Sequence, residues 1–306
     1  IIFSADSDGD DAGAPRFDYQ VTASTQGGDI LFGGGNKEGT DFPKAYTWEG
    51  IEFNGLDLAT NGGDIFIRGT SDSGRGLIFL GTTSILTSGG NVSIYGESDS
   101  DNGVYIGGTA SIDTGGGNIL IDAETESDRG FEQTGSVTLD SGSGTIYVRG
   151  RAGVESDSTN VDHHGVFLNG SDFTLRSSNS TSNAISLIGV GTRGRGIDQN
   201  AGAFTVESSS STGGVLIDGT RGSGRNWSIS FAGTSTSILA AGGTITITGR
   251  NDDGDVGGAI GYVNFVNTSI GRKAGTNVTT SAANVLITSD GFQQTYNSGR
   301  VPDIDT

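Results

Sequence analysis

The chain has 306 residues, a formal net charge of −19 at pH 7 and a sequence pI of about 4.2, and it contains no cysteine. An acidic chain has no basic surface to displace the counterions of a nucleic acid, and without cysteine it forms neither disulfides nor a thiolate site. The 55 glycines do not follow the collagen triplet, and no apolar run is long enough to cross a membrane. Composition therefore predicts an all-β chain with many turns, no nucleic-acid partner and no membrane span.

Residues 1–11, IIFSADSDGDD, combine a short apolar stretch with a cluster of acids. Ile1 and Phe3 fall on offsets that are apolar in later repeats, and Asp8 and Asp10 fall on offsets that are acidic in later repeats. We interpret this stretch as a first strand with its acidic corner, because it lacks the twelve-residue pattern of a helix-flanked calcium loop.

A motif of the form G-G-x-Φ-x-Φ-x-G, where Φ is apolar, recurs along the chain. It reads GGDILFGG from Gly27 and GGDIFIRG from Gly62, and from Gly62 three consecutive spacings are 27 residues. Two more short alternating runs complete each unit, for example GVYIGG (103–108) and TASIDT (109–114). Alternation with period two indicates a strand with one buried face. Three such strands in 27 residues predict a three-sided solenoid coil, whereas an immunoglobulin-like array would repeat near every 100 residues.

Equivalent offsets of successive units are apolar, which predicts columns of side chains stacked along one core. Parallel stacking of coils also satisfies the backbone hydrogen bonds between neighbours. The predicted core stack consists of Ile65, Ile67, Val92, Ile94, Ile119, Ile121, Ile146 and Val148.

The whole chain, residues 1–306, is predicted to be one parallel β-solenoid domain of about ten coils, each of about 27–30 residues. Three longer spacings between motifs indicate insertions, at about 34–50, 151–164 and 250–262. We expect them to bulge as loops from one corner of the coil.

Acidic residues recur at the turn that follows each first strand. Stacked coils would place these carboxylates about 5 Å apart, which is unfavourable unless they are neutralised. Three alternatives remain open: a solvated acidic edge, pairing with Arg75 and Arg129, or calcium binding, since calcium favours oxygen ligands. The candidate calcium ligands are Asp8, Asp10, Asp72, Asp99, Asp101, Glu126 and Asp128, together with Asp252, Asp253 and Asp255 of the last insertion.

Other polar residues receive structural interpretations. Gln133 and Gln199 fall on core offsets, which predicts hydrogen-bonded amides inside the solenoid. The only two histidines, His163 and His164, lie in an insertion and are expected at a loop tip. Parallel β-helices also carry polysaccharide-active enzymes, but catalysis there needs clustered carboxylates, and no acid pair is evident, so we expect no enzymatic activity.

The two ends are predicted to contact further coils. Residues 1–11 begin in strand register, and residues 290–306 supply an incomplete last coil. Open sheet edges are templates for another strand, and a head-to-tail contact that does not close produces a fibre. The predicted assembly interface consists of Ile1, Ile2, Phe3, Phe292, Gln294 and Tyr296.

The segment GGNVSIYGESDSDNGVYIGGTASIDTGGGNILIDAETESDRG resembles the repeats of filamentous-haemagglutinin-like bacterial surface proteins. The resemblance implies a right-handed parallel β-helix, export, and a role in adhesion or in building a fibre. The leading hypothesis is an extracellular structural protein that assembles with itself by coil stacking. The alternatives are a module that binds carbohydrate or a host surface through the inserted loops, and, less favoured, a polysaccharide-active enzyme.

Overall fold

The computed structural model describes residues 1–3, 15–33, 44–45, 49–153, 163–222, 227–251, 262–271, 284–289, 291–292 and 303–304. Every regular element in these residues is a β-strand, and none of them forms a helix of the length and apolarity that crossing a membrane requires. The strands form three sheets in which all neighbours are parallel, and each coil contributes in turn to the first, second and third sheet. The predicted three-sided parallel β-solenoid is confirmed.

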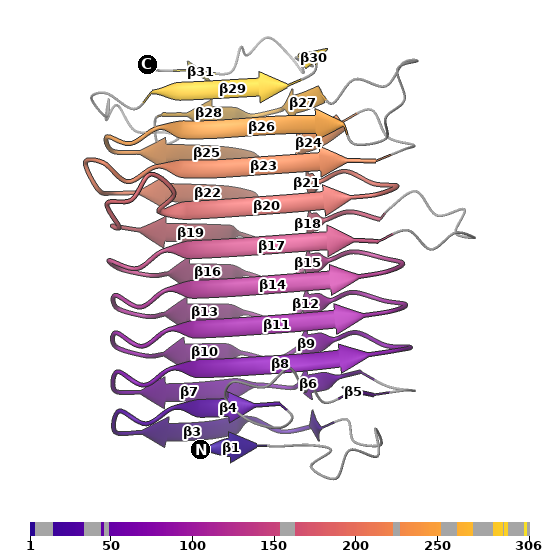
Figure 1. Cartoon of the computed structure of the whole chain (residues 1–306), viewed down its shortest axis with the longest axis vertical. Coiled ribbons are helices and arrows are strands. Elements are labelled where there is room, and N and C mark those ends of the chain that lie inside the picture. The colour runs from indigo at the N-terminus through magenta and orange to yellow at the C-terminus, as the bar shows by residue number, and fades with distance from the viewer. Residues whose placement is uncertain are drawn as a thin grey trace.

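Figure 1 shows how the chain winds. Each coil crosses the front face from left to right, turns to the back at the right-hand edge and returns to the left while it climbs from the N- to the C-terminal end. This path is a right-handed coil, the hand that parallel crossover connections favour.

The first sheet forms the front face of Figure 1 and contains the longest strands. In order it consists of β1 (Ile2–Phe3), β4 (Ile30–Phe32), β8 (Ile65–Ser71), β11 (Val92–Ser98), β14 (Ile119–Thr125), β17 (Ile146–Ala152), β20 (Ile185–Gly191), β23 (Val215–Arg221), β26 (Ile245–Asn251) and β29 (Val285–Ser289), with β5 (Lys44–Ala45) paired beside β8.

The second sheet has short strands, most of them of three residues. It consists of β2 (Arg16–Phe17), β6 (Ile51–Phe53), β9 (Leu77–Phe79), β12 (Val104–Ile106), β15 (Phe131–Gln133), β18 (Val166–Leu168), β21 (Ile197–Gln199), β24 (Trp227–Phe231), β27 (Tyr262–Phe265) and β30 (Gly291–Phe292).

The third sheet closes the coil. It consists of β3 (Val21–Thr25), β7 (Leu56–Thr60), β10 (Thr83–Leu86), β13 (Ala110–Asp113), β16 (Val137–Asp140), β19 (Phe173–Ser177), β22 (Ala203–Ser208), β25 (Ser235–Ala240), β28 (Thr268–Ile270) and β31 (Asp303–Ile304).

The coils differ in completeness along the stack. Seven consecutive coils have a first-sheet strand of seven residues, beginning with β8, β11, β14, β17, β20, β23 and β26. The two coils before them and the one after them have shorter first strands. The expected number of about ten coils therefore included three abbreviated ones, and only about seven turns are complete.

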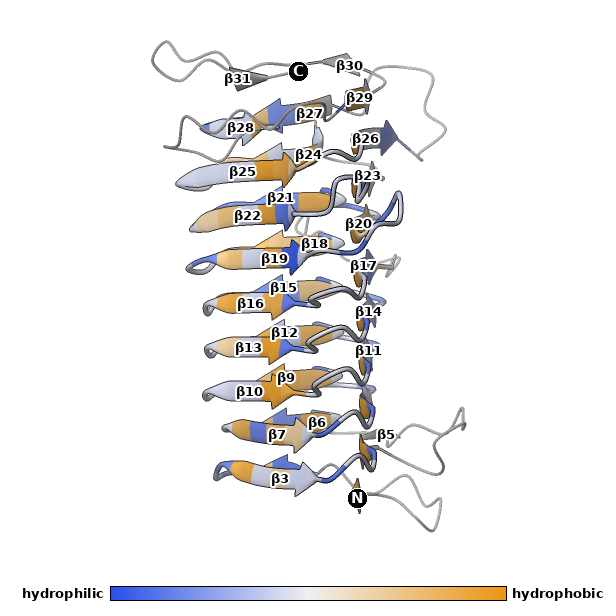
Figure 2. Ribbon diagram, turned by 90° about the vertical axis from the view of Figure 1, so that its left-hand side faces the viewer, coloured by the Kyte–Doolittle hydropathy of each residue, from blue (hydrophilic) through white to orange (hydrophobic). Residues whose placement is uncertain are grey.

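The predicted core stack lies inward in register along the first sheet. Ile65, Val92, Ile119 and Ile146 are aligned from coil to coil, and the other four residues form the adjacent column two positions on. All eight side chains are at most 2% exposed. Figure 2 shows hydrophobic residues recurring on successive strands up the stack. One narrow core therefore runs through all the coils.

The corner between the third and first sheets is held by a ladder of polar side chains. The Asp64 carboxylate accepts a hydrogen bond from the Asn91 backbone N–H (2.7 Å), Asn91 accepts from the Asn118 N–H (2.9 Å), and Asn118 accepts from the Thr145 N–H (2.9 Å). Each bond joins one coil to the next. Gly89, just before this corner, has a φ of +116°, which a residue with a side chain adopts only at a cost.

The segments that contain the three predicted insertions connect a first-sheet strand to a second-sheet strand. Their boundaries are narrower than predicted. Arg151 belongs to β17 and Arg250 to β26, because these strands extend past the core to the full seven residues. Tyr262 begins β27.

A substitution pair on β14 tests which face carries the stability. Ile121→Ala removes a side chain with no exposed surface, and we expect it to lower the free energy of unfolding by about 3 kcal/mol. Leu120→Ala changes the neighbouring outward side chain, which is 38% exposed, and should cost less than about 1 kcal/mol. Urea unfolding of both variants measures the difference; equal losses would contradict the inward assignment of Ile121.

Candidate functional site: the corner between the first and second sheets

The turns after β8, β11 and β14 begin with a hydroxyl residue at the end of the strand. The Ser71 hydroxyl accepts a hydrogen bond from the Gly74 N–H (2.9 Å), and the Ser98 hydroxyl accepts one from the Asp101 N–H (2.9 Å). Ser98 also donates to the Gly74 carbonyl of the preceding coil (2.6 Å). These side chains fix the shape of each turn and join consecutive turns.

The backbones of neighbouring coils approach closely at the inner end of the same corner. A Cβ atom on Gly103 would lie 2.5 Å from both the backbone nitrogen and the backbone oxygen of Glu124 in the next coil. Only glycine fits this close approach of two backbones. The glycine that precedes each of β6, β9, β12, β15, β18 and β21 is thus required by the stacking of the coils.

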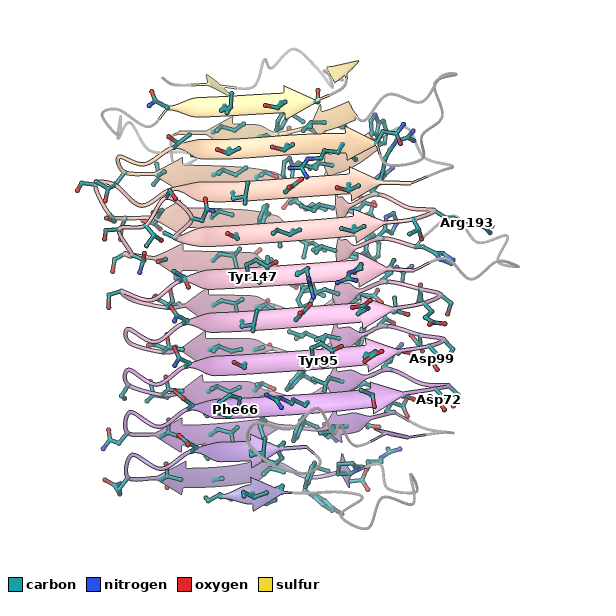
Figure 3. The ribbon with its side chains drawn as sticks, in the orientation of Figure 1. Phe66, Asp72, Tyr95, Asp99, Tyr147 and Arg193 are labelled. Carbon is teal, nitrogen blue, oxygen red and sulfur yellow. The ribbon has the colours of Figure 1, made fainter. Side chains whose placement is uncertain are left out.

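The predicted acidic residues lie on this corner. Figure 3 shows Asp72 and Asp99 at equivalent places on successive coils. Asp101 is paired with Arg75, with 3.4 Å between Oδ1 and Nε, so arginine pairing operates here. Burial raises the pKa of Asp128, the nearby Arg129 lowers it and the charge of Asp101 raises it. The carboxylates of Asp101 and Asp128 therefore influence each other across one coil.

Calcium binding stays a prediction. Within the described ranges, no three or more histidine, aspartate or glutamate side chains converge as a metal site requires. Asp72, Asp99, Asp101, Glu126 and Asp128 follow one corner of the stack without forming such a group. Asp8, Asp10, Asp252, Asp253 and Asp255 lie outside the described residues.

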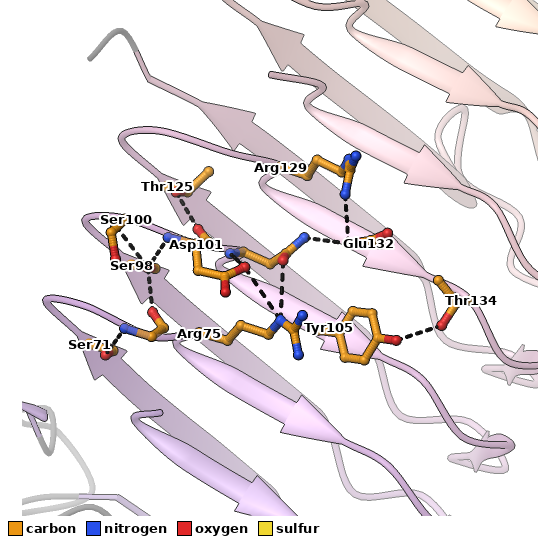
Figure 4. Close-up of polar contacts among 12 residues, drawn as sticks. Ser71, Arg75, Ser98, Ser100, Asp101, Tyr105, Thr125, Arg129, Glu132 and Thr134 are labelled. Carbon is orange, nitrogen blue, oxygen red and sulfur yellow. Dashed lines mark hydrogen bonds and ion pairs between the residues drawn. The ribbon is translucent and has the colours of Figure 1, made fainter. Parts of the chain in front are cut away.

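A partly buried polar layer covers the outer face of the second sheet, beneath the turns of this corner (Figure 4). Glu132, in the middle of β15, accepts hydrogen bonds from Arg129 Nη1 (3.1 Å) and Asn102 Nδ2 (2.7 Å). The Glu132 side chain is only 9% exposed. We call this set of side chains the corner layer; it consists of Arg75, Asp101, Asn102, Tyr105, Arg129, Glu132, His164, Phe167, Arg195, Asp198 and Trp227.

Arginines of the corner layer lie over aromatic rings of the next coil. Arg75 lies 4.2 Å from the ring centroid of Tyr105, whose hydroxyl is 2.8 Å from that of Thr134. Arg129 lies 4.5 Å from the centroid of Phe167, and Arg195 lies 4.7 Å from that of Trp227. Cation–π contacts of this kind stabilise most where water is excluded.

The histidines are not at a loop tip, and this expectation was wrong. His163 is fully buried and His164 is 3% exposed. The Nδ1 atom of His164 accepts the backbone N–H of Arg195 (3.0 Å), and its Nε2 atom lies 3.6 Å from Asp198, which also pairs with Arg195 (2.5 Å). The insertion lies before His163, so the two histidines belong to the coil itself.

The corner layer was missed because of the short second-sheet strands. The middle residue of each three-residue strand points away from the core, and alternation alone predicts that it is solvated. Glu132 and Asp198 are nevertheless 7% and 3% exposed, since the arginine and histidine side chains of the turns fold over them. The available signal was the arginine placed directly before the glycine at Arg75, Arg129 and Arg195.

The core amides lie where they were predicted. Gln133 and Gln199 occupy one column of the second sheet with Leu168 between them, and both are fully buried. Gln199 donates to the carbonyls of Gly202 and Ser235, each at 3.0 Å. Gln133 donates to the Gly135 carbonyl. The Gln199 oxygen also accepts a hydrogen bond from the Thr236 hydroxyl, whereas the buried Gln133 oxygen has no hydrogen-bond partner among the described residues. The bonds of both amides hold the second corner of the solenoid.

The predicted assembly residues are only partly described. Ile1 and Ile2 are 49% and 66% exposed, and the Phe3 ring is stacked on Phe32 with centroids 4.4 Å apart. Phe292 ends β30, which pairs with β27. Gln294 and Tyr296 lie outside the described residues.

Chemically, the corner layer is suited to holding the turns against the second sheet. Its charges face partners within the layer, and its aromatic rings are covered by guanidinium groups. Breaking a buried pair leaves an uncompensated charge, which costs several kcal/mol, whereas an exposed pair contributes little.

Two arginine variants distinguish the contribution of a buried ion pair from that of an exposed one. Arg129→Ala removes the partner of the buried Glu132 carboxylate and should lower the free energy of unfolding by about 3 kcal/mol. Arg151→Ala breaks the Arg151–Glu124 pair, whose side chains are 41% and 33% exposed, and should cost less than about 1 kcal/mol. Urea unfolding at neutral pH measures both; similar losses would show that the corner layer adds no stability of its own.

The raised pKa of Asp128 predicts how stability depends on pH. A carboxyl whose pKa is higher in the folded state contributes stability below its unfolded pKa, about 4, and loses it as pH rises through the folded value. Asp128→Asn should therefore melt at the same or a higher temperature than the parent at pH 7, and this advantage should vanish near pH 3.5. A variant less stable than the parent at pH 7 would mean that the pairing with Arg129 outweighs the cost of burial.

Comparison with known proteins finds no match: no family model, no curated protein sequence and no solved structure is similar to the chain. The likeness to haemagglutinin-like repeats rests on the repeat motif alone.

Proposed function

We propose that the protein is a non-enzymatic structural rod, exported to the cell surface, and that it forms a segment of a surface fibre by head-to-tail stacking of coils. The observation that carries the proposal is the unbroken parallel pairing of all three sheets. A stack in which each coil is bonded only to its neighbours forms a stiff, extendable body. Export is supported by the resemblance of the repeats to those of surface proteins.

The backbone of the first rung supports axial stacking. The carbonyls of Ile1 and Phe3 accept hydrogen bonds from Leu31 and Gly33 of the next coil. Backbone groups alternate in direction along a strand, so those of Ile2, between them, face the opposite edge. This edge is suited to pairing with a further coil, from the same chain or from another.

Charge supports the same arrangement. A rod with a net charge of −19 repels a parallel neighbour along its whole length, whereas end-to-end contact brings only one rung of each molecule together. Axial growth is therefore favoured over lateral clumping, and salt or cations would shift the balance.

Electron microscopy of the purified chain tests the proposal. One solenoid of this size is a rod roughly 50 Å long, and stacking should give longer rods as the concentration rises. Ile2→Pro removes an N–H at the outer edge of β1 and should stop this growth, because proline cannot donate to a ladder. Ile2→Val is the matched control and should still assemble.

Single rods at every concentration would overturn self-assembly. If rods of Ile2→Pro and Ile2→Val grow equally, the contact between chains does not involve β1.

The alternative of surface binding through the inserted loops depends on residues 34–50, 151–164 and 250–262, most of which lie outside the described residues. No described observation favours it.

A further inference from the structure

Aromatic and aliphatic side chains recur on the outer face of the first sheet over four consecutive coils. They are Phe66 on β8, Tyr95 on β11, Leu120 on β14 and Tyr147 on β17. Figure 3 shows Phe66, Tyr95 and Tyr147 on the face turned toward the viewer. Leu120 is 38% exposed, and the three rings are partly exposed. We call this surface the front face.

The charged groups of the front face pair with one another. Arg149 binds Asp122 of the preceding coil through two hydrogen bonds, of 2.7 and 2.6 Å. Arg151 donates a single hydrogen bond, of 3.1 Å, to Glu124 of the preceding coil. Asp122 and Arg149 lie in the column of Tyr95, and Glu124 and Arg151 lie in the next outward column along the strands. Because these charges pair, this face is close to neutral while the whole chain carries −19.

Tyr95 adds a polar group at the centre of the face. Its hydroxyl donates to Glu97 (3.1 Å), and burial together with the charge of Glu97 raises the pKa of Tyr95. The hydroxyl therefore stays protonated at physiological pH.

This combination defines the chemistry of a partner. A polyanion, or a second copy of the chain lying alongside, would be repelled by the net charge, and a cationic partner would be attracted to the corners, where the acidic residues recur from coil to coil. An uncharged partner is neither repelled by the net charge nor attracted to the acidic corners. It must offer an apolar surface to the rings and hydroxyl groups to the carboxylates and guanidinium groups beside them.

Sugar rings of a neutral polysaccharide meet both requirements, because one face of a pyranose carries C–H groups and its rim carries hydroxyls. Phe66, Leu120 and Tyr147 share one outward column with Ser93, and Tyr95 lies two positions further along its strand, in the column of Asp122. Successive coils are about 4.8 Å apart along the stack. From Phe66 to Tyr147 the row covers three coil steps, or about 14 Å, enough for several sugars of an extended chain.

We propose that the front face, from β8 to β17, binds a neutral polysaccharide whose chain runs along the axis of the solenoid. Tyr95 and Tyr147 stack on sugar rings, and the Asp122–Arg149 pair holds sugar hydroxyls. This binding goes beyond the structural role and does not depend on axial assembly, since it needs only the coils from β8 to β17.

Affinity electrophoresis of the purified chain tests the proposal, with dextran, hydroxyethyl cellulose, galactomannan or polygalacturonate included in native gels. We expect at least one neutral polymer to retard the chain and polygalacturonate not to. Tyr147→Ala and Tyr95→Ala should each weaken that retardation at least about fivefold. Leu86→Ala, an outward side chain of the third sheet that is 45% exposed, is the matched control and should leave it unchanged.

No retardation by any neutral polymer, or retardation by polygalacturonate alone, would overturn the proposal. So would an equal effect of Leu86→Ala. If the mobility of the chain in gels without polymer depends on protein concentration, and Tyr147→Ala changes that dependence, the front face is a contact between copies of the chain instead. Melting curves of the variants show that the fold is kept, and rod lengths by electron microscopy report separately on axial assembly.

Discussion

The hydrogen bonds between equivalent backbone groups of successive coils are the interaction on which everything else in this protein depends. They set one spacing, about 4.8 Å, for all three sheets. Each side chain therefore has as its closest neighbours the residues at the same offset in the coils before and after it. The Asp64–Asn91–Asn118 ladder, the Arg149–Asp122 pair and the Phe3–Phe32 stack are all contacts of this kind.

Because equivalent residues stack on one another, the effect of repeating a residue depends on its chemistry. Stacked apolar or amide side chains stabilise the solenoid, and stacked like charges destabilise it. Isoleucines stacked on isoleucines extend the core, and asparagines stacked on asparagines extend a ladder of hydrogen bonds. Carboxylates stacked on carboxylates repel, as Asp101 and Asp128 do. The chain relieves this repulsion by placing arginines next to the acids, so that charges pair between coils on the front face and within the corner layer. The surface thereby remains compatible with long-range stacking.

The sequence predicted the repeat, the three strands per coil and the columns Ile65–Val92–Ile119 and Ile67–Ile94–Ile121, because these follow from the spacing of apolar residues. It also placed Gln133 and Gln199 in the core from their offsets alone. It failed at His164, Glu132 and Asp198, which are buried on the outer side of the second sheet. Periodicity distinguishes the two faces of a strand, but it contains no information on what a neighbouring turn will cover.

By itself, therefore, the sequence determined the coil: its three strands, the positions of its glycine-rich corners, and which residues stack. Only the tertiary structure decided which polar side chains meet across a corner. Arg129 reaches Glu132 and Phe167 because the turn folds back over the second sheet. The physical reason is that stacking depends on the spacing of residues along the chain, which the sequence contains. Burial outside the core depends instead on the path of a turn in three dimensions.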